Sequence, residues 1–489
     1  MIELDPAQAA SLITKMLALP ESRTLDFKRV SGKMVSKALE TLCAFANTDG
    51  GALALGVEDP KKSSGTARFY GVEENPEAVD ELQRKVRTEF HPPIETIRFV
   101  HIPCTLRDGA AGHLLLAQVP KSDKVHSIVN DGTWTRLDAG NREMSATEIT
   151  ELSYRRGVRS AESEPLQIAL ELLATDAWTR FVAARGLKSG TQAEHLYCIG
   201  LAEKVGGEIW PRRAAVLLFA EEPGSLLAAH GTRADIRLMV YDGNAVKAGP
   251  TPNLRKQPKT IRGPLIDQID ETVRVVQGEL AQGITLSSSG FKTQHVYPDR
   301  VMKEAIVNAV IHRDYRLNRD IFIRIFDNRI EVESPGTFLS TITPANIATA
   351  GSKARNPLIA GALREYPQPP NIDAGEGVRM MFAEMAAAHL YPPRYALNIE
   401  AAIESVTITL LNLKRPSVWD EVSDWIDRHG PIANTNLCQI AKIDTLRASR
   451  MLKLWVEQGM LVPLSERAKR NMAYAKSTLV DKPGDLFST

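Results

Sequence analysis

The sequence has no long apolar segment, few cysteines and almost no net charge. No apolar run reaches the roughly 20 residues that a transmembrane helix needs, and the N-terminus (M-I-E-L-D-P-A-Q) lacks the basic and apolar regions of a secretory signal. The four cysteines, Cys43, Cys104, Cys198 and Cys438, form no C-x-x-C pair. Their scatter argues against a zinc site or a disulfide framework and favours a reducing compartment. We therefore expect a cytoplasmic protein with no membrane partner.

The formal net charge is +1, so no basic footprint for nucleic acid covers the whole chain. Any argument for nucleic-acid binding must rest on local basic patches. With 43% hydrophobic and 24% charged residues among 489, the composition is that of an ordinary globular protein. Length predicts about three domains, and the mixture of helical and strand patterns predicts a multidomain α+β fold.

The segment Arg300–Tyr315 (R-V-M-K-E-A-I-V-N-A-V-I-H-R-D-Y) has the apolar pattern of a largely buried helix. Glu304 and Asn308 are four residues apart and therefore share one face of that helix. Unpaired polar groups cost about 1–3 kcal/mol each when buried, and a bound ion with a polar ligand would supply partners. The alternative is a plain helix with two solvated polar residues and a basic end.

In residues 1–155, a helix at Ala7–Leu19 precedes a half-buried strand within Glu21–Lys28. A helix at Lys33–Ala46, a tight turn at Asn47–Gly51 and a following strand complete a helix–turn–strand unit. This order of elements predicts the core of an N-terminal α+β domain.

Basic and aromatic residues of this part are candidates for contacts with nucleic acid. Lys28, Lys33 and Lys37 are placed to contact phosphates, which would position a nucleic acid without reading its sequence. An ordinary solvated charged face is the alternative for each of them. Trp134 and Arg136 are candidates for stacking on a base, and core packing is the alternative for Trp134.

Residues 156–290 are expected to connect this part to the helix at Arg300–Tyr315. A linker at Arg159–Pro165 is followed by two predicted helices, Leu166–Leu173 and Ala177–Arg185. The segment 234–243 reads as a strand, and Gly263–Val276 begins an amphipathic helix. None of these segments carries a residue pattern that predicts chemistry.

Residues 416–489 have the pattern of a winged helix-turn-helix, whose third helix can enter a DNA major groove. Three helices are predicted at Val418–Gly430, Thr435–Ala441 and Thr445–Leu461, and Asp444 is placed to cap the third. The basic residues of the third helix and of the following wing are candidates for DNA contacts: Arg447, Arg450, Lys453, Arg467, Lys469 and Arg470. Protein contacts are the alternative role of such a domain.

The N-terminal motifs resemble those of the Schlafen-type AlbA-like domain of bacterial transcriptional regulators. The resemblance rests on Glu21, D-F-K at 26–28, F-A-N-T-D-G-G at 45–51, L-G-V-E-D at 55–59, G-V-E-E-N at 71–75 and W-T-R at 134–136. Some Schlafen proteins use three carboxylates of this fold as a metal-dependent nuclease site. The resemblance implies Glu21, Asp26 and either Glu58 or Asp59 as catalytic ligands of Mg²⁺ or Mn²⁺, which prefer oxygen ligands.

The segment E-A-I-V-N-A-V-I-H-R-D-Y resembles the first ATP-binding motif, E-x-x-x-N, of the divergent GHKL (Bergerat-like) ATPase module. This resemblance implies an α/β sandwich over residues 291–415. Glu304 would activate or orient the attacking water. Asn308 would help to hold Mg²⁺ against the phosphates of ATP.

The strand pattern after this helix departs from the family. Asp320–Gly336 alternates as a hairpin that turns at Asp327-Asn328. Its end, E-S-P-G, stands where the family has D-x-G-x-G, so the Asp that binds adenine has no clear counterpart. The resemblance leaves Glu333 and Gly336 as the nearest candidates for nucleotide binding.

Two later segments are candidates for a nucleotide lid. G-S-K-A-R-N-P-L-I contributes Lys353, Arg355 and Asn356, and D-A-G-E-G-V-R-M-M contributes Gly375 and Gly377. Backbone N–H groups at a helix start favour phosphate, and glycine lets the backbone approach it closely. A plain turn at the start of a helix is the alternative.

Together these patterns predict a homo-oligomeric transcriptional regulator in which ATP and Mg²⁺ occupy the GHKL-like module. DNA or RNA would bind the AlbA-like domain and the winged helix. Weak ATPase activity would belong to this scheme. The enzymatic alternative is a Schlafen-like metal-dependent RNase or DNase in phage defence, and the third alternative is a scaffold that binds neither nucleotide nor metal.

Overall fold

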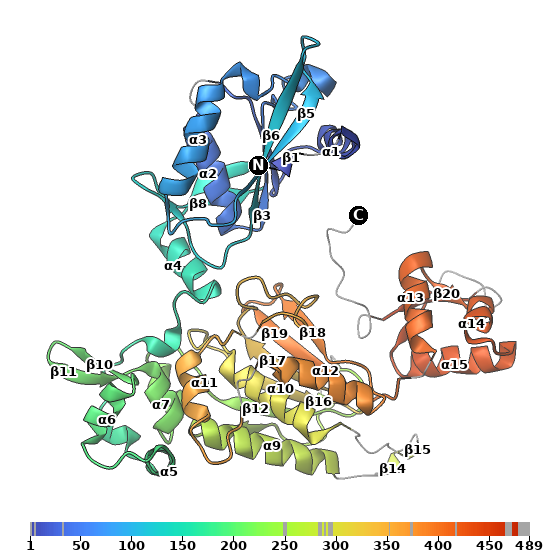
Figure 1. Cartoon of the computed structure of the whole chain (residues 1–489). Coiled ribbons are helices and arrows are strands. Elements are labelled where there is room, and N and C mark those ends of the chain that lie inside the picture. Colours follow the sequence, from blue (N-terminus) through green and yellow to red (C-terminus); the bar gives the residue numbers. More distant parts are fainter. Residues whose placement is uncertain are drawn as a thin grey trace. The chain divides into compact units, whose positions relative to one another are not determined.

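The computed structural model describes residues 2–3, 6–31, 34–247, 252–281, 286–287, 290–291, 297–351, 353–371, 375–415, 418–464 and 472–477. The chain divides into two compact units (Figure 1). The first comprises residues 1–159 with 339–341, and the second comprises the remainder. No helix of the described part is both long and apolar enough to cross a bilayer.

The first unit is built on a five-stranded mixed sheet in the order β1-β5-β6-β3-β2. Its strands are Ile2–Glu3 (β1), Leu25–Lys28 (β2), Gly50–Leu55 (β3), Arg98–Thr105 (β5) and Ala111–Pro120 (β6). Two ribbons pair Phe90–His91 (β4) with Ser127–Ile128 (β7), and Trp134–Leu137 (β8) with Gly140–Glu143 (β9). The helices are Pro6–Ala18 (α1), Met34–Asn47 (α2), Pro76–Thr88 (α3) and Ala146–Arg155 (α4), with short 3₁₀ turns at Gly65–Arg68 (η1) and Val72–Glu74 (η2).

Helices cover both faces of this sheet, with α2 and α3 on one side and α1 on the other (Figure 1). The two-residue period of a strand explains the division. In β3, Leu53 and Leu55 pack in the core beneath α2 and α3, whereas Ala54 belongs to the core beneath α1. The helices and strand predicted between residues 7 and 46 are confirmed, with ends shifted by a residue or two.

The predicted turn after α2 is held by buried side chains. Asn47 donates to the backbone oxygens of His126 at 2.8 Å and Trp134 at 3.0 Å. Gly50 has a φ of +81°. A Cβ there would lie 2.7 Å from the backbone nitrogen of Lys121, the residue after β6. Arg156 donates to the carbonyls of Asn47 and Thr48 and so caps the end of α2. The N-T-D-G-G motif is therefore explained by backbone geometry.

The second unit centres on a six-stranded sheet in the order β13-β12-β16-β17-β19-β18. The sheet strands are Ile236–Val240 (β12), Lys259–Ile261 (β13), Ile321–Ile325 (β16), Arg329–Pro335 (β17), Arg394–Asn398 (β18) and Ser405–Leu411 (β19). Only the β12–β16 pair within it is parallel. The predicted hairpin turning at Asp327-Asn328 is confirmed. Because β12 and β13 belong to this sheet, it extends across the domain boundary predicted after residue 290.

Helices α9 (Leu265–Ala281), α10 (Asp299–Ile311) and α12 (Gly377–Ala387) lie side by side on one face of this sheet (Figure 1). The other elements before the C-terminal part are α5 (Asp176–Arg185), α6 (Gln192–Cys198), α7 (Arg213–Phe219), α8 (Pro223–Ala228), α11 (Pro357–Leu363), β10 (Ala202–Val205), β11 (Glu208–Pro211), β14 (Leu286–Ser287), β15 (Gly290–Phe291) and the 3₁₀ turn η3 (Ala161–Ser163). The helix predicted at Leu166–Leu173 is wrong, because only a 3₁₀ turn, η4 (Leu170–Leu173), forms there.

The C-terminal part contains α13 (Trp419–His429), α14 (Asn434–Ala441) and α15 (Thr445–Glu457). A three-stranded antiparallel sheet follows the order β20-β22-β21, from Ile432–Ala433 (β20), Leu461–Pro463 (β21) and Ala473–Lys476 (β22). Trp419 and Trp455 pack edge to face in its core, with ring centroids 5.0 Å apart. The predicted cap is confirmed, since the Asp444 carboxylate accepts the Arg447 amide at 2.8 Å.

Candidate functional site

The helix α10 carries the two polar residues that its sequence places on one face. Its other side is buried, with Val301, Ala305 and Ile306 among the buried residues. Glu304 and Asn308 are half-buried, and the Asn308 amide donates to Glu304 Oε1 at 3.1 Å. Burial raises the pKa of the Glu304 carboxyl above its ordinary value, and the hydrogen bond from Asn308 lowers it. These two side chains therefore form one polar site on α10.

The G-E-G segment meets this polar site at the start of α12. A Cβ added to Gly377 would lie 1.9 Å from Glu304 Oε1, so only glycine lets α12 begin directly against the carboxylate. Gly375 has a φ of +70°, which also favours glycine. Two segments that the sequence identified separately thus come together around Glu304.

Glu333 lies on the other face of the sheet. Ser334 donates from β17 to the Ala309 carbonyl of α10 at 2.7 Å, so Ser334 faces α10, and the neighbouring Glu333 faces away. The buried Glu333 carboxylate pairs with Arg319 at 2.6 Å and Arg324 at 2.7 Å. The structure therefore gives Glu333 a role in an ion-pair network and places it away from Glu304.

Gly336, a further sequence candidate, forms the turn after β17. It has a φ of +121°, and a Cβ there would lie 3.0 Å from Asp314 Cβ. Its amide donates to the Glu404 carbonyl at 2.9 Å. Close backbone packing explains this glycine.

The segment that contains Lys353, Arg355 and Asn356 packs against the end of α10. The Asn356 amide donates to the carbonyls of Ile311 and Arg313, both at 2.8 Å. Arg355 donates to the His312 carbonyl at 3.1 Å. Lys353 is half-buried beside them. Asn356 thus satisfies carbonyls that a helix end leaves unpaired.

Replacing Asn356 with alanine is expected to destabilise the second unit. The change leaves two buried carbonyls without their donor, at a cost of about 1–3 kcal/mol for each group. Urea denaturation followed by circular dichroism measures the loss. An unchanged midpoint would contradict the capping role, and Asn346→Ala, in an exposed turn, serves as the control.

In the first unit, Asp26 is buried and paired with Arg136. The two residues are 3% and 1% exposed, and Arg136 Nη1 donates to Asp26 Oδ2 at 2.8 Å. Arg136 also donates to the carbonyls of Ser22 and Leu25, and Lys28 contributes a second pair to Asp26 at 3.2 Å. The prediction that Arg136 stacks on a base is wrong, because its guanidinium is buried over the ring of Phe45.

Of the other predicted carboxylates, Glu21 lies beside Asp26. Burial raises the pKa of the Glu21 carboxyl, and the charges of Asp26 and Asp59 raise it further. Glu58 pairs with Arg29 at 3.8 Å and Lys62 at 3.2 Å. Within the described residues, no group of three or more His, Cys, Asp or Glu side chains is arranged to hold a metal ion.

A buried arginine accompanies these carboxylates. Arg68 is 2% exposed, and its guanidinium stacks over Phe27, 4.4 Å from the ring centroid. Burial lowers the pKa of Arg68, and the charges of Asp59, Glu21 and Glu58 act in the opposite direction. The sequence analysis did not identify Arg68. Its cation and that of Arg136 compensate carboxylates that a metal was expected to bind.

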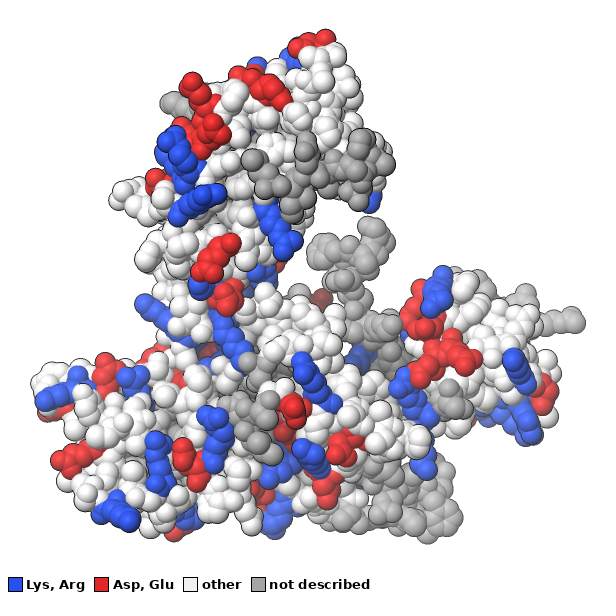
Figure 2. Space-filling model, in the orientation of Figure 1, with Lys and Arg blue, Asp and Glu red and all other residues white. Residues whose placement is uncertain are grey.

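The basic residues predicted to contact nucleic acid differ in their exposure and in their ion pairing. Lys37 pairs with Glu40 at 2.9 Å, although its side chain is mostly exposed. Arg447, Arg450 and Lys453 are all exposed on α15. Lys33 and the wing residues Arg467, Lys469 and Arg470 lie outside the described residues. On the face shown in Figure 2, basic and acidic side chains are interspersed over the second unit, including the part formed by α15.

Glu162 is a buried acidic residue that no sequence pattern indicated. It is 0% exposed, and its carboxylate accepts the Leu358 and Ile359 amides at the start of α11, both at 2.8 Å. Burial raises its pKa to about 7, whereas these amides and Arg212 act to lower it. Glu162 therefore fastens the η3 segment to α11.

Two segments of the chain match known families. Residues 21–145 match the family described as Schlafen, AlbA_2. Residues 318–410 match the family described as ATP-dependent DNA helicase recG C-terminal. The chain contains a Schlafen AlbA_2 domain and an ATPase-like domain. The Asp26–Arg136 pair belongs to the AlbA_2 domain.

The match to the ATPase-like domain begins after α10, so Glu304 and Asn308 lie outside it. Among solved structures, the DIP2311 protein from Corynebacterium diphtheriae is similar over 96% of this chain and 98% of its own, with 16% identity and a TM-score of 0.39. The two domains indicate a function that involves nucleic acid and ATP.

Proposed function

We propose that the protein is a transcriptional regulator that binds nucleic acid in response to ATP and Mg²⁺. The observation that carries this proposal is the contact between Glu304 and Gly377, which unites the E-x-x-x-N helix with the G-E-G turn. An ATPase-like domain in the same unit supports it.

At this site, the side-chain oxygen of Asn308 would help to hold Mg²⁺, and the Glu304 carboxylate would orient the attacking water. Mg²⁺ is commonly held by one or two such protein oxygens together with phosphate oxygens and water. Bound Mg²⁺ would neutralise charge on the ATP phosphates. The backbone N–H groups at the start of α12 would face the phosphates, and Lys353 is a further cation for them.

We propose a winged helix for residues 416–489, with α15 as the DNA-reading helix. The order of α13, α14 and α15 with a small antiparallel sheet suits this fold. Arg447, Arg450 and Lys453 are exposed on α15, and the apolar Leu446 and Leu454 are exposed as well. Such basic residues would contact DNA phosphates. The AlbA_2 domain would provide the second nucleic-acid surface.

Replacing Gly377 with alanine is expected to shift the ATP response of DNA binding to about tenfold higher ATP concentration or more. The new Cβ displaces the flexible Glu304 carboxylate and should weaken ATP–Mg²⁺ binding by about tenfold or more, which corresponds to roughly 1.4 kcal/mol. DNA affinity is measured at one fixed salt concentration without ATP–Mg²⁺ and over a series of its concentrations, because phosphate contacts depend steeply on salt. Gly361→Ala, on α11, is the control; its added Cβ would meet only the Arg364 side chain at 3.7 Å.

Equal DNA affinities with and without ATP–Mg²⁺ in the wild-type protein would refute the nucleotide response. A ligand shifts an arrangement only if it binds one arrangement more tightly than the other. An unshifted response in Gly377→Ala would instead place the nucleotide elsewhere.

A metal-dependent nuclease is the second candidate, and the raised pKa of Glu21 beside Asp26 favours it. Glu21→Ala is expected to abolish Mn²⁺-dependent cleavage of tRNA or single-stranded nucleic acid, since it removes a hard oxygen ligand. Cleavage is followed on denaturing gels. Unchanged cleavage in Glu21→Ala would rule out this site, and Glu95→Ala, which removes a carboxylate whose side chain is 75% exposed, is the control.

A further inference from the structure

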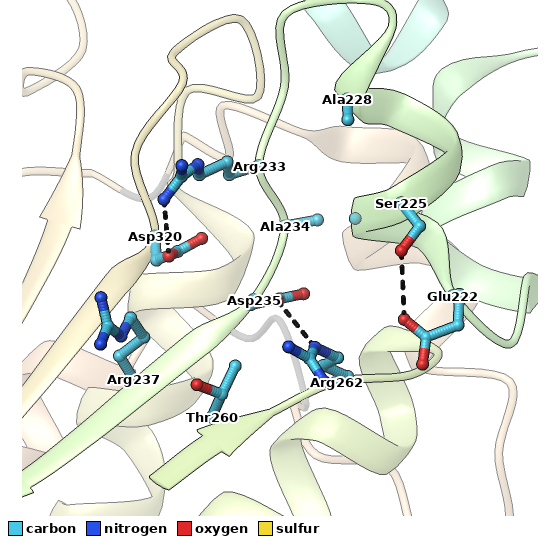
Figure 3. Close-up of a pocket in the computed structure, with 11 residues that line it drawn as sticks. Glu222, Ser225, Ala228, Arg233, Ala234, Asp235, Arg237, Thr260, Arg262 and Asp320 are labelled. Atoms are coloured by element: carbon cyan, nitrogen blue, oxygen red, sulfur yellow. Dashed lines mark hydrogen bonds and ion pairs between the residues drawn. The ribbon is translucent and has the colours of Figure 1, made fainter. Parts of the chain in front are cut away.

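A charged cavity of about 600 Å³ lies at one end of the second unit's sheet, between β12, β13 and the short helix α8 (Figure 3). Arginines and carboxylates alternate around it. Figure 3 shows Arg233 directed toward Asp320, and Asp235 directed toward Arg262, with Glu222 and Ser225 on the opposite wall. The volume falls within the range of small-molecule sites.

The ion pairs in this cavity do not occupy all of its arginines. Arg262 Nε donates to Asp235 Oδ2 at a long 3.3 Å. Arg233 lies 3.7 Å from Asp320, which is too far for a direct hydrogen bond. Arg237, the third arginine of the wall, makes no ion pair with a described residue, and its Nε has no hydrogen-bond partner among them. Arg237 is therefore the arginine of this wall that makes no direct ion pair with a carboxylate of the described residues.

Buried polar atoms without partners gather around the same cavity. Asp320 is 6% exposed, and its Oδ1 accepts no hydrogen bond from the described residues. The buried Arg313, which does not itself line the cavity, has two such donors, Nε and Nη1. The charges of Asp320 and Asp235 act on Arg313, so these groups are neighbours. Buried polar atoms normally have partners, and a cluster of exceptions indicates a missing ligand or water.

The donors and acceptors define the chemistry of a suitable ligand. Three arginines in the wall favour a phosphate, which accepts their paired N–H groups. The carboxylates of Asp235, Asp320 and Glu222 accept hydrogen bonds from hydroxyl or amino groups. A ligand that satisfies both sets carries one phosphate on a body rich in hydroxyl or amino groups.

We propose that this cavity is a second small-molecule site, which binds a phosphate monoester of the size of a sugar phosphate or a nucleoside monophosphate. Arg237 is its principal phosphate ligand, and Asp320 accepts from the body of the ligand. None of Glu304, Asn308 and Gly377 lines the cavity, so this site is separate from the proposed ATP site.

The cavity is connected to α10 through Arg313, which follows this helix in the chain and forms hydrogen bonds near the cavity. Arg313, two residues beyond the end of that helix, donates to the carbonyls of Arg233 and Arg319. A ligand that moves Arg233 therefore acts on the end of α10. The consequence for ATP binding rests on the proposed function, whereas binding in the cavity does not.

Isothermal titration calorimetry of the full chain with inorganic phosphate, ribose 5-phosphate, AMP and adenosine tests the site. We expect the two phosphate esters to bind more tightly than phosphate, and adenosine not to bind. Arg237→Gln should weaken ester binding by about tenfold or more. Arg274→Gln, an exposed arginine on α9, should leave it unchanged, and so should Glu304→Ala, which removes the proposed ATP site.

Absence of ester binding at millimolar concentration would overturn the proposal, and so would equal affinity in the wild-type protein and Arg237→Gln. Loss of AMP binding in Glu304→Ala would assign that binding to the ATP site and would also overturn it. If Arg237→Gln fails to fold, as judged by thermal unfolding, Arg262→Gln decides by the same criterion. Binding of an amino acid without binding of the esters would show that the cavity takes a carboxylate. This result would refute a phosphate monoester as the ligand.

Discussion

Replacing Asp26 with alanine is expected to destabilise the AlbA_2 domain by about 3–5 kcal/mol. Asp26 and Arg136 are 3% and 1% exposed and form a pair of 2.8 Å. Removal of the carboxylate leaves the Arg136 guanidinium buried without its charge partner. That uncompensated charge, and not the net value of the pair, produces the large effect. Thr41 also loses a hydrogen bond to Asp26.

Denaturation in urea measures the change, and Asp49→Ala is the matched control. Asp49 pairs with Arg23 and Lys121 at the surface, where an ion pair contributes about 0–1 kcal/mol. The double replacement Asp26→Leu with Arg136→Met should recover much of the stability, because it removes both buried charges. A loss of less than about 1 kcal/mol in Asp26→Ala would show that Arg136 is stabilised by its carbonyl contacts alone.

This result bears on how a nuclease experiment is interpreted. Loss of cleavage in Asp26→Ala would follow from unfolding of the AlbA_2 domain as readily as from loss of a metal ligand. Glu21 lies beside Asp26, and its carboxylate accepts a long hydrogen bond of 3.3 Å from the Phe27 amide. Glu21→Ala therefore separates catalysis from stability better than Asp26→Ala does.

Short-range patterns predicted the elements of this protein because helix periodicity, strand alternation and caps are determined by nearby residues. The α10 helix, the β16–β17 hairpin and the Asp444 cap are examples. The partnership of Asp26 with Arg136 spans 110 residues and depends on the β8–β9 ribbon packing against α2. No local pattern identifies such a partner.

In the candidate site on α10, too, local patterns predicted some features, and others depend on contacts between distant residues. Spacing alone predicted that Glu304 and Asn308 share a face, and their hydrogen bond confirms it. Alternation in β17 implies that Glu333 and Ser334 point to opposite faces, but only the structure shows which face carries α10. The asparagine of the predicted lid, Asn356, caps α10 because its side chain reaches carbonyls more than forty residues away in sequence.

The end of α10 connects several parts of the second unit. Asn356 and Arg355 hold its last carbonyls, and Asn356 immediately precedes α11. Ser160, the first residue of this unit, donates to the Arg355 carbonyl at 2.9 Å. Glu162 then accepts the amides of α11. The chain therefore enters the second unit through contacts with the segment that caps the candidate nucleotide helix.

Protonation of Glu162 is expected to make these contacts depend on pH. Its pKa is raised from 4.5 to about 7 by burial, so the folded state holds a proton that the unfolded state releases. The stability contributed by this proton is complete below about pH 4.5 and is lost as the pH rises through 7. A shift of this size corresponds to a loss on the order of 3 kcal/mol across that window.

The measurement compares the unfolding free energies of the wild-type protein and Glu162→Gln from about pH 5 to about pH 8. Glutamine carries no charge at any of these pH values, so Glu162→Gln should gain stability relative to the wild type as the pH rises. Glu171→Gln, an exposed carboxylate in the following turn, controls for the change in net charge. A difference between wild type and Glu162→Gln that stays constant with pH would mean that the two α11 amides keep Glu162 ionised throughout, despite its burial.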